Sequence, residues 1–323
     1  MSSPYPENQT SIREFILLGF VNMTQGKTFL IVLFLSMYTI CFLGNSLIIT
    51  VAVLNPSLHT PMYFFLGNLS FLDICYISVT VPKMLADLWV QSPGISFMGC
   101  AAQMYFLISL AGAEGFLLAS MALDRYFAIC RLLVYARLMN KWTCFQLAAI
   151  SWICGFLNSS LHTALTFRLS FCISNGISHF FCDIPPLLSI SCSDTTINEV
   201  ALFTVGVLVG FSPFLFTLVS YSLILHAVLS NQQKGQRHKA ISTCVSHVTV
   251  VIMFYGSGIF TYFRPTSSYS LEKDQLVGVL YNVITPTLNP IIYSLRNKDV
   301  KMAMWKLIMK EHSLLQCRSS RNN

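Results

Sequence analysis

Two sets of polar residues stand out in this chain because they interrupt long apolar runs. Asp124-Arg125-Tyr126 places an acid, a base and a phenol together at the end of the run 106–123. Asp73 and Glu114 lie inside two further runs, where an ionised carboxylate is costly. Polar groups at such positions usually face protein or water and serve a function. We therefore expect them to hold a proton or an ion, or to exchange partners during a conformational change.

Both sets also have a structural interpretation. Arg125 could anchor a helix end by extending its charged group to the lipid headgroups. Asp73 and Glu114 could be neutral acids that only hydrogen-bond and pack. In the functional interpretation they share a proton or bracket a sodium ion, and Asn45 and Asn289 complete the polar surroundings.

The composition indicates which elements must carry these residues. Of the 323 residues, 54% are hydrophobic and only 10% are charged, whereas soluble domains carry about 25% charged residues. The chain is therefore predicted to be an all-α membrane protein, a seven-transmembrane helix bundle over residues 27–294. The seven apolar runs that can cross about 30 Å of hydrocarbon lie near 27–54, 61–89, 98–122, 142–163, 197–229, 240–263 and 275–294.

The charges orient this bundle. Of the 20 Lys and Arg residues, 14 lie in the connections and the tail on the side of Arg125. Because short cytoplasmic segments are enriched in basic residues, we expect residues 1–26 to be extracellular and the tail, 295–323, to be cytoplasmic. The net charge of +7 then reflects topology, and it gives no case for nucleic-acid binding because the basic residues are scattered over short loops.

The two ends carry further signals. Residues 1–26 lack the charged and apolar regions of a cleavable signal peptide, and they contain N-glycosylation sequons at Asn8 and Asn22. In the tail, the segment 298–310 places Val300 and Met304 on an apolar face and lysines on the opposite face. We expect this segment to form a short amphipathic eighth helix on the inner lipid leaflet.

Four of the eleven cysteines fall on the predicted extracellular side, and they are Cys100, Cys172, Cys182 and Cys192. Disulfides form in that oxidising environment. Four cysteines allow three pairings, and the residues alone do not choose among them. A zinc site with His179 is the alternative, but the spacing matches no zinc finger or ribbon, so we favour two disulfides.

Taken together, the motifs resemble those of a rhodopsin-like G-protein-coupled receptor, and in detail those of an olfactory (odorant) receptor of the larger, terrestrial-vertebrate class. The resemblance extends over nearly the whole chain. The matching segments are Leu58-His59-Thr60-Pro61-Met62-Tyr63-Phe64, Met121-Ala122-Leu123-Asp124-Arg125-Tyr126, Ser220-Tyr221, Lys239-Ala240 to His247, and Pro286 to Tyr293 with the following Ser294-Leu295-Arg296-Asn297.

The resemblance implies roles for particular residues. It pairs Cys100 with Cys182 and Cys172 with Cys192. It also implies that Arg125 rests against the neighbouring acid and then turns inward to engage tyrosines and a heterotrimeric G protein of the stimulatory, olfactory type, which raises cyclic AMP. The implied switch residues are Asp124, Arg125, Tyr126, Tyr221, Asn289, Pro290 and Tyr293.

A ligand pocket is implied in the extracellular half of the bundle. Leu107 stands where amine receptors carry an aspartate, so a neutral ligand is expected. An apolar pocket with a few hydroxyl and amide groups suits a small volatile odorant, although each residue could instead serve ordinary packing between helices. The expected pocket residues are Leu107, Ile108, Ala111, Gly112, Val205, Val209, Tyr255, Gly258, Ile259, Tyr262 and Asn282.

Some positions depart from the family pattern. Leu123, Phe127 and Ile241 replace residues that are usual in the family, and Arg131-Leu132 replaces Asn-Pro in a loop that touches the G protein. These departures put coupling efficiency in doubt. A poorly coupling relic receptor is therefore one alternative function.

A channel or transporter and an intramembrane hydrolase are competing functions from different classes of protein. The first could use Asp73 and Glu114, but the repeated halves with matched broken helices that are usual in transporters are missing. The second could use Ser257 with His247, but ten residues on one helix separate them by about 15 Å. We therefore expect no enzyme and no cofactor beyond an allosteric sodium ion. The expected surroundings are the plasma membrane, its lipid and export chaperones.

Overall fold

The structure of the protein is a computed structural model, which describes residues 13–20, 26–90, 93–172, 174–231, 234–262, 271–296 and 300–302. Within these ranges, seven helices are long and apolar enough to cross a membrane, so the prediction of a seven-helix bundle is confirmed. The first four are α1 (Lys27–Leu54), α2 (Pro61–Val90), α3 (Phe97–Cys130) and α5 (Lys141–Phe167).

The fifth and seventh helices are each interrupted by a wide π-helical turn, and the sixth is continuous. The elements are α7 (Thr196–Gly206), η3 (Val207–Phe211) and α8 (Ser212–Asn231); α9 (Lys234–Tyr262); and α10 (Leu271–Val279), η5 (Leu280–Ile284) and α11 (Thr285–Arg296). A proline lies two residues beyond each wide turn, at Pro213 and Pro286. Because proline has no backbone N–H, the regular hydrogen-bond ladder cannot continue through it, which favours the wider turn before it.

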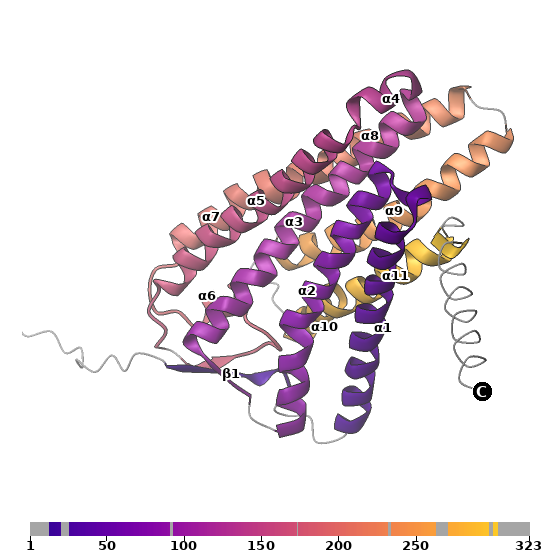
Figure 1. Ribbon diagram of the computed structural model, residues 1–323. Coiled ribbons are helices and arrows are strands. Elements are labelled where there is room, and N and C mark those ends of the chain that lie inside the picture. Colours follow the sequence, from indigo (N-terminus) through magenta and orange to yellow (C-terminus); the bar gives the residue numbers. More distant parts are fainter. Residues whose placement is uncertain are drawn as a thin grey trace, which may run out of the picture.

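The helices form one bundle with two differently built ends (Figure 1). At one end, a short helix, α4 (Leu132–Leu138), follows α3. We call this end the arginine end because Arg125 lies near it, inside α3, which continues to Cys130. The opposite end carries β1 (Glu14–Leu17) and both disulfides, and we call it the disulfide end.

A small sheet closes the disulfide end. Its strand order is β2-β1-β3, where β2 is Gly94–Ser96 and β3 is Gly176–Ile177. β1 pairs with β2 in antiparallel orientation, with Phe15 opposite Ile95, and it pairs with β3 in parallel orientation. Phe15 is fully buried and its ring packs edge-on against Phe171 of the connecting loop. Part of the amino-terminal segment therefore belongs to the folded core of this end.

α3 is the central helix, and it approaches α5 more closely than large side chains would permit. A Cβ atom at Gly112 would lie 3.0 Å from the Cα of Gly155, and one at Gly155 would lie 2.3 Å from the carbonyl oxygen of Ser109. Small residues at a helix–helix interface let the two backbones come together, which is a common way of packing helices in lipid. This contact fixes the α5 face that turns toward the centre of the bundle.

The remaining predictions about the chain ends fall mostly outside the described residues. The two sequons at Asn8 and Asn22 lie there, and so does most of the segment 298–310. Residues 300–302 are helical, and Val300 is buried against the bundle, but an eighth helix cannot be traced from three residues.

Candidate functional site

A cavity of about 340 Å³ lies beside α3, between α5, the interrupted fifth helix and α9. That volume is at the lower end of the range of about 300–1,000 Å³ that is usual for small-molecule sites. Apolar and aromatic side chains dominate the walls. The lining residues are Ile108, Ala111, Gly112, Gly115, Asn158, His162, Ile184, Leu202, Gly206, Val209, Gly210, Phe211, Phe214, Phe254, Tyr255, Gly258, Ile259 and Tyr281.

Seven of the eleven residues expected in the pocket line this cavity, and they are Ile108, Ala111, Gly112, Val209, Tyr255, Gly258 and Ile259. Leu107 instead packs in the main apolar core, and Val205 does not line the cavity. Asn282 is buried in η5 and donates to the carbonyl oxygen of Gly278 one turn earlier, at 2.9 Å. The side chain of Tyr262 lies outside the described residues.

The α5 wall of the cavity was not expected from the sequence. It consists of Asn158 and His162, which lie one helical turn apart. The available signal was the spacing of two polar residues by four positions within an apolar span, which puts both on one face of a helix. Hydropathy alone gives no reason to turn that face inward, whereas the close contact of α5 with α3 does.

Little of the polar surface in the cavity is hydrogen-bonded to the protein. The hydroxyl of Tyr255 donates to the backbone carbonyl oxygen of Gly115 at 3.0 Å, so it is already engaged. In contrast, Oδ1 of Asn158 is buried without a hydrogen-bond partner, and His162 is 4% exposed and bonds to no described residue. These two side chains are the uncommitted polar groups that the described walls offer to a ligand.

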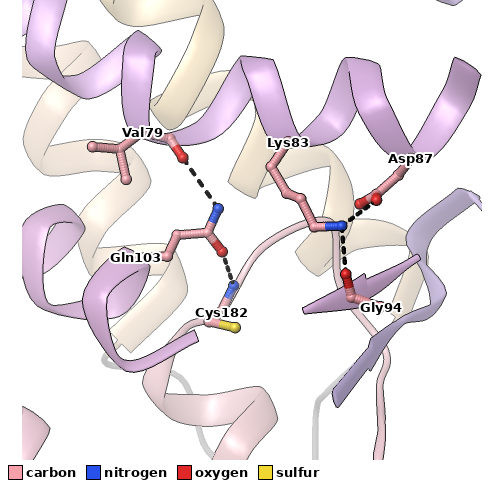
Figure 2. Close-up of polar contacts among 6 residues, drawn as sticks. All are labelled: Val79, Lys83, Asp87, Gly94, Gln103 and Cys182. Carbon is pink, nitrogen blue, oxygen red and sulfur yellow. Dashed lines mark hydrogen bonds and ion pairs between the residues drawn. The ribbon is translucent and has the colours of Figure 1, made fainter. Parts of the chain in front are cut away.

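The loop between α5 and α7, residues 168–195, covers the disulfide end, and covalent and polar contacts tie it to the helices. The structure contains the Cys100–Cys182 disulfide, whose Cα atoms are 5.5 Å apart. Beside it, Oε1 of Gln103 accepts a hydrogen bond from the backbone N–H of Cys182 at 2.9 Å, and Nε2 donates to the carbonyl oxygen of Val79 at 3.1 Å (Figure 2). One side chain thus connects α3, α2 and the loop.

A second polar contact holds the edge of the sheet. The ammonium group of Lys83 pairs with Asp87 one turn later on α2 and donates to the carbonyl oxygen of Gly94 in β2 at 2.8 Å (Figure 2). The Cys172–Cys192 disulfide closes the loop itself, with Cα atoms 5.8 Å apart. Because all four cysteines are in disulfides, they are not available as thiolates, and the zinc alternative is excluded.

His179 belongs to the same loop and is buried against the seventh helix. Its Nε2 lies 3.4 Å from the backbone carbonyl oxygen of Asp274, and its ring packs edge-on against Phe180 and Phe181. Burial disfavours the charged imidazolium and lowers the pKa of His179 to about 4. The neutral ring is therefore part of the contact that holds the loop on α10.

The buried acids lie in the middle of the bundle. Nδ2 of Asn289 on α11 donates to both carboxylate oxygens of Asp73, at 3.0 Å each. Nearby, Nδ2 of Asn45 donates to the carbonyl oxygen of Cys41 at 3.0 Å. Oε1 of Glu114 is buried without a hydrogen-bond partner. Among the described residues, no group of three or more His, Cys, Asp or Glu side chains could hold a metal ion.

At the arginine end, Asp124 has a different partner from the expected one. Its Oδ1 accepts a hydrogen bond from the hydroxyl of Tyr135 on α4 at 2.9 Å. The prediction that Arg125 rests against Asp124 is wrong for this conformation, because both side chains are described and no ion pair joins them. Consecutive helical residues point in different directions, which leaves the carboxylate free for a residue on the next helix.

The other switch residues lie on α3, α8 and α11. The hydroxyl of Tyr221 on α8 is hydrogen-bonded to Nδ1 of His247 on α9 at 2.7 Å. Nε of Arg125 and the hydroxyl of Tyr293 are both buried without partners. Tyr126 packs against a small apolar cluster of α8 and α9, and Pro290 lies against α1, where a Cβ at Gly44 would be 3.0 Å from the proline Cβ.

The hydrolase alternative finds no support in this arrangement. The hydroxyl of Ser257 donates to the carbonyl oxygens of Met253 and Phe254 in its own helix. His247 is hydrogen-bonded to a tyrosine and is 0% exposed. The serine and the histidine therefore form no nucleophile–base pair.

The sequence is similar to known proteins over most of its length. The model of the olfactory receptor family matches residues 34–311. The chain is 49% identical over 302 residues to mouse "Olfactory receptor 5AP2", covering 94% of this chain and 95% of that protein. It is 50% identical over 301 residues to human "Olfactory receptor 1F1", covering 93% of this chain and 96% of that protein.

Proposed function

The chain belongs to the olfactory receptor family, and from this premise we propose that a small neutral odorant binds in the cavity beside α3 and activates a heterotrimeric G protein at the arginine end. This is a family of receptors and not of enzymes. The observation that carries the proposal is the position of the cavity, because α9 forms one of its walls and also reaches the Tyr221–His247 contact.

The chemistry of the walls supports a neutral and mostly apolar ligand. The lining residues include no Asp, Glu, Lys or Arg, and this holds for the part of the chain that the structure describes. A charged ligand would lose its hydration there without gaining a counter-ion. Alcohols, ketones, esters, aldehydes or terpenoids of modest size fit these conditions, whereas amines and carboxylates do not.

The continuity of α9 supports a path from the ligand to the arginine end. Tyr255 lies in the cavity wall and His247 lies eight residues earlier, about 12 Å along the same helix. A ligand that prefers one position of α9 shifts the receptor toward that position by its difference in affinity. Separation of His247 from Tyr221 then frees the tyrosine hydroxyl for Arg125, and Tyr293 offers a second free hydroxyl.

The partner and the orientation follow from the same proposal. The arginine end faces the cytoplasm and binds a stimulatory, olfactory-type G protein, so that cyclic AMP rises. The disulfide end is extracellular, which agrees with its two disulfides and with the excess of basic residues toward the opposite side. The protein works in the plasma membrane, surrounded by its lipid, and uses export chaperones to reach it.

A sodium ion fits the buried acids as an allosteric ligand. Asp73 and Glu114 would hold it, and the side-chain amides of Asn45 and Asn289 would complete the polar surroundings. Support comes from the orphaned Oε1 of Glu114, since a buried carboxylate oxygen without a donor is suited to a cation. The ion would neutralise charge inside the bundle and stabilise the conformation that encloses it.

A cyclic-AMP reporter in cells that express the full chain tests the proposed function. Neutral volatile compounds should raise cyclic AMP in these cells and not in cells that express Arg125→Ala at the same surface density. Amines and carboxylates of similar size should be inactive. A response that persists in Arg125→Ala, or a response to charged compounds alone, would contradict the proposal.

A further inference from the structure

Among the described residues, the polar side chains of the cavity wall that are left without a hydrogen bond belong to α5. Four of the lining residues carry polar side-chain atoms, namely Asn158, His162, Tyr255 and Tyr281. The hydroxyl of Tyr255 is committed to the carbonyl oxygen of Gly115. Neither Asn158 nor His162 is hydrogen-bonded to any described residue, although Oδ1 of the asparagine is buried and the histidine is 4% exposed.

The packing of α5 on α3 explains why these side chains face the cavity. Gly112 and Gly155 bring the two backbones together, and Asn158 follows Gly155 by three residues on the same face. A Cβ atom at Gly112 would be 3.8 Å from Nδ2 of Asn158, so the asparagine fills the space beside that glycine. His162 comes one turn later, and residues four apart on a helix have Cβ atoms about 5–6 Å from each other.

This pair of side chains offers a ligand both kinds of hydrogen-bonding atom. An amide presents a carbonyl acceptor and an NH₂ donor whichever way it is turned, and a neutral imidazole presents one donor and one acceptor nitrogen. A hydroxyl group both donates and accepts, so it can satisfy an acceptor and a donor in this wall at once. A ketone, an aldehyde or an ether only accepts, and would leave the buried Oδ1 of Asn158 without a partner.

We propose that Asn158 and His162 form a polar anchor that selects odorants with a hydroxyl group, alcohols and phenols, over carbonyl compounds and ethers of the same skeleton. The proposal rests on the proposed function, because it assumes that the cavity is the ligand site, and it narrows the neutral ligands considered there to one class.

The anchor also orients the ligand. With its hydroxyl on α5, the hydrocarbon part of the molecule points across the cavity toward the aromatic side chains of Phe211, Phe214 and Phe254. Two of these belong to the interrupted fifth helix and the third belongs to α9. The polar group therefore fixes position, and the size and shape of the hydrocarbon part determine the contact with the helix that is proposed to move.

The test measures binding directly, without signalling. The thermal stability of the purified full-length receptor is titrated with matched pairs: menthol and menthone, borneol and camphor, citronellol and citronellal, and p-cresol and its methyl ether. In the unsubstituted receptor the alcohol or phenol of each pair should stabilise at about tenfold lower concentration than its partner, as one additional hydrogen bond gives.

Substitutions then assign the preference to residues. Asn158→Leu keeps a side chain of similar size and removes both polar atoms, so the alcohols should lose about tenfold in apparent affinity while the ketones and ethers change little. His162→Leu should have an effect in the same direction. Ser160→Ala is the matched control, because Ser160 lies on the exposed side of α5 and bonds only to Phe156 of its own helix.

Each outcome bears on the proposal. Equal losses for both members of the pairs in Asn158→Leu, equal affinities in the unsubstituted receptor, or no stabilisation by any alcohol or phenol would overturn it. A cyclic-AMP assay with the same compounds distinguishes a failure of the polar anchor from a failure of the proposed function. Alcohol-selective stabilisation without any cyclic-AMP response would support the anchor and contradict the signalling part of the proposed function.

Discussion

The disulfide end and the arginine end differ in what holds them together. Two disulfides cross-link the first, although Nδ1 of His179 is buried there without a partner, whereas among the described residues only non-covalent contacts such as Asp124–Tyr135 and Tyr221–His247 hold the second. At the disulfide end, the backbone groups of Cys182 and Gly94 and the side chain of Gln103 are all hydrogen-bonded. Toward the arginine end, Nε of Arg125 and the hydroxyl of Tyr293 are buried without partners.

Buried polar groups in proteins are nearly always hydrogen-bonded, so unpaired ones call for an explanation. The explanation offered by the proposed function is that their partners are supplied in another conformation, when α9 has moved and the G protein is bound. The difference between the two ends suggests a receptor with one fixed end, which shapes the ligand site, and one end that rearranges.

The largest effect is expected from breaking the covalent link at the fixed end. Cys100→Ser removes a disulfide that joins residues 82 positions apart, and such a loss typically destabilises by about 2–5 kcal/mol. We expect little correctly folded receptor at the cell surface, measured by labelling of intact cells. Cys172→Ser should be milder, since it opens a link of only 20 positions, and Cys154→Ser is the control because that cysteine is free. Normal surface levels of Cys100→Ser would show that the link is dispensable.

The polar bridge of the same end should matter next. Gln103→Leu leaves the N–H of Cys182 and the carbonyl of Val79 without their partner, and we expect it to destabilise the receptor by about 1–3 kcal/mol. The melting temperature of the purified receptor should fall clearly. Gln275→Leu removes a more exposed contact to the loop and is expected to change it little. Equal shifts in the two variants would mean that the buried hydrogen bonds of Gln103 stabilise the receptor no more than the exposed one of Gln275.

Sodium should act between the two ends, in the middle of the bundle where the buried acids lie. If an ion between Asp73 and Glu114 stabilises the inactive bundle, replacing sodium by a large inert cation should raise agonist affinity about fivefold or more. Radioligand or thermal-shift titration of purified receptor provides the measurement. Asp73→Asn should lose the dependence on sodium. An unchanged affinity in the two salts would leave the acids with a packing role.

The hydrogen bond between Tyr221 and His247 holds α9 against α8 in this conformation. His247→Leu removes that bond and leaves the tyrosine hydroxyl available to Arg125. The equilibrium between the resting and the active conformation should shift toward the active one by about 2- to 10-fold, which corresponds to a net hydrogen bond of about 0.5–1.5 kcal/mol. Basal cyclic AMP at matched surface density is the readout. Tyr221→Phe should lower the maximal response instead. Reduced basal activity in His247→Leu would contradict the assignment of this bond to the resting state.

The last effect concerns the pH dependence of the disulfide end. The pKa of His179 is about 4 in the docked loop and about 6.5 in an exposed histidine. As the pH falls, His179 is therefore protonated more readily when the loop has left α10 than when it is bound there. The free energy that holds the loop on α10 is fully present above about pH 6.5 and is lost as the pH falls toward 4. The groups of α10 nearest to the ring are the backbone of Asp274 and the site of Gly278, and Phe180 and Phe181 flank it.

The melting temperature should therefore fall by a few degrees between neutral pH and pH 4.5, and this change should be absent in His179→Phe. His226→Gln is the control, because that histidine is exposed on α8. An identical pH profile in His179→Phe and in the unsubstituted receptor would exclude the buried ring as its source.

The sequence predicts the bundle well for a physical reason. A helix that crosses lipid must satisfy its own backbone and must be apolar along its whole length, and both requirements can be read locally. The sheet at the disulfide end could not be predicted this way, because β1 pairs with strands that follow about 80 and 160 residues later in the chain.

The same limit applies to the candidate site. The residues of α3 and α9 in the cavity follow from helical spacing and resemblance, whereas the inward direction of Asn158 is set by the contact of Gly155 with Gly112 on another helix. The partner of Asp124 is likewise Tyr135 on α4, a helix of 7 residues that is too short to be recognised as an element in a hydropathy pattern.

Hydrogen–deuterium exchange of the purified receptor, alone and with an activating odorant and the G protein, shows whether the disulfide end stays fixed while the arginine end moves. We expect exchange to change in α9 around His247 and in α4, while the amides of β1, β2 and β3 keep the same rates. A change confined to the sheet and the covering loop, with α9 unaltered, would show that the disulfide end is the part that rearranges.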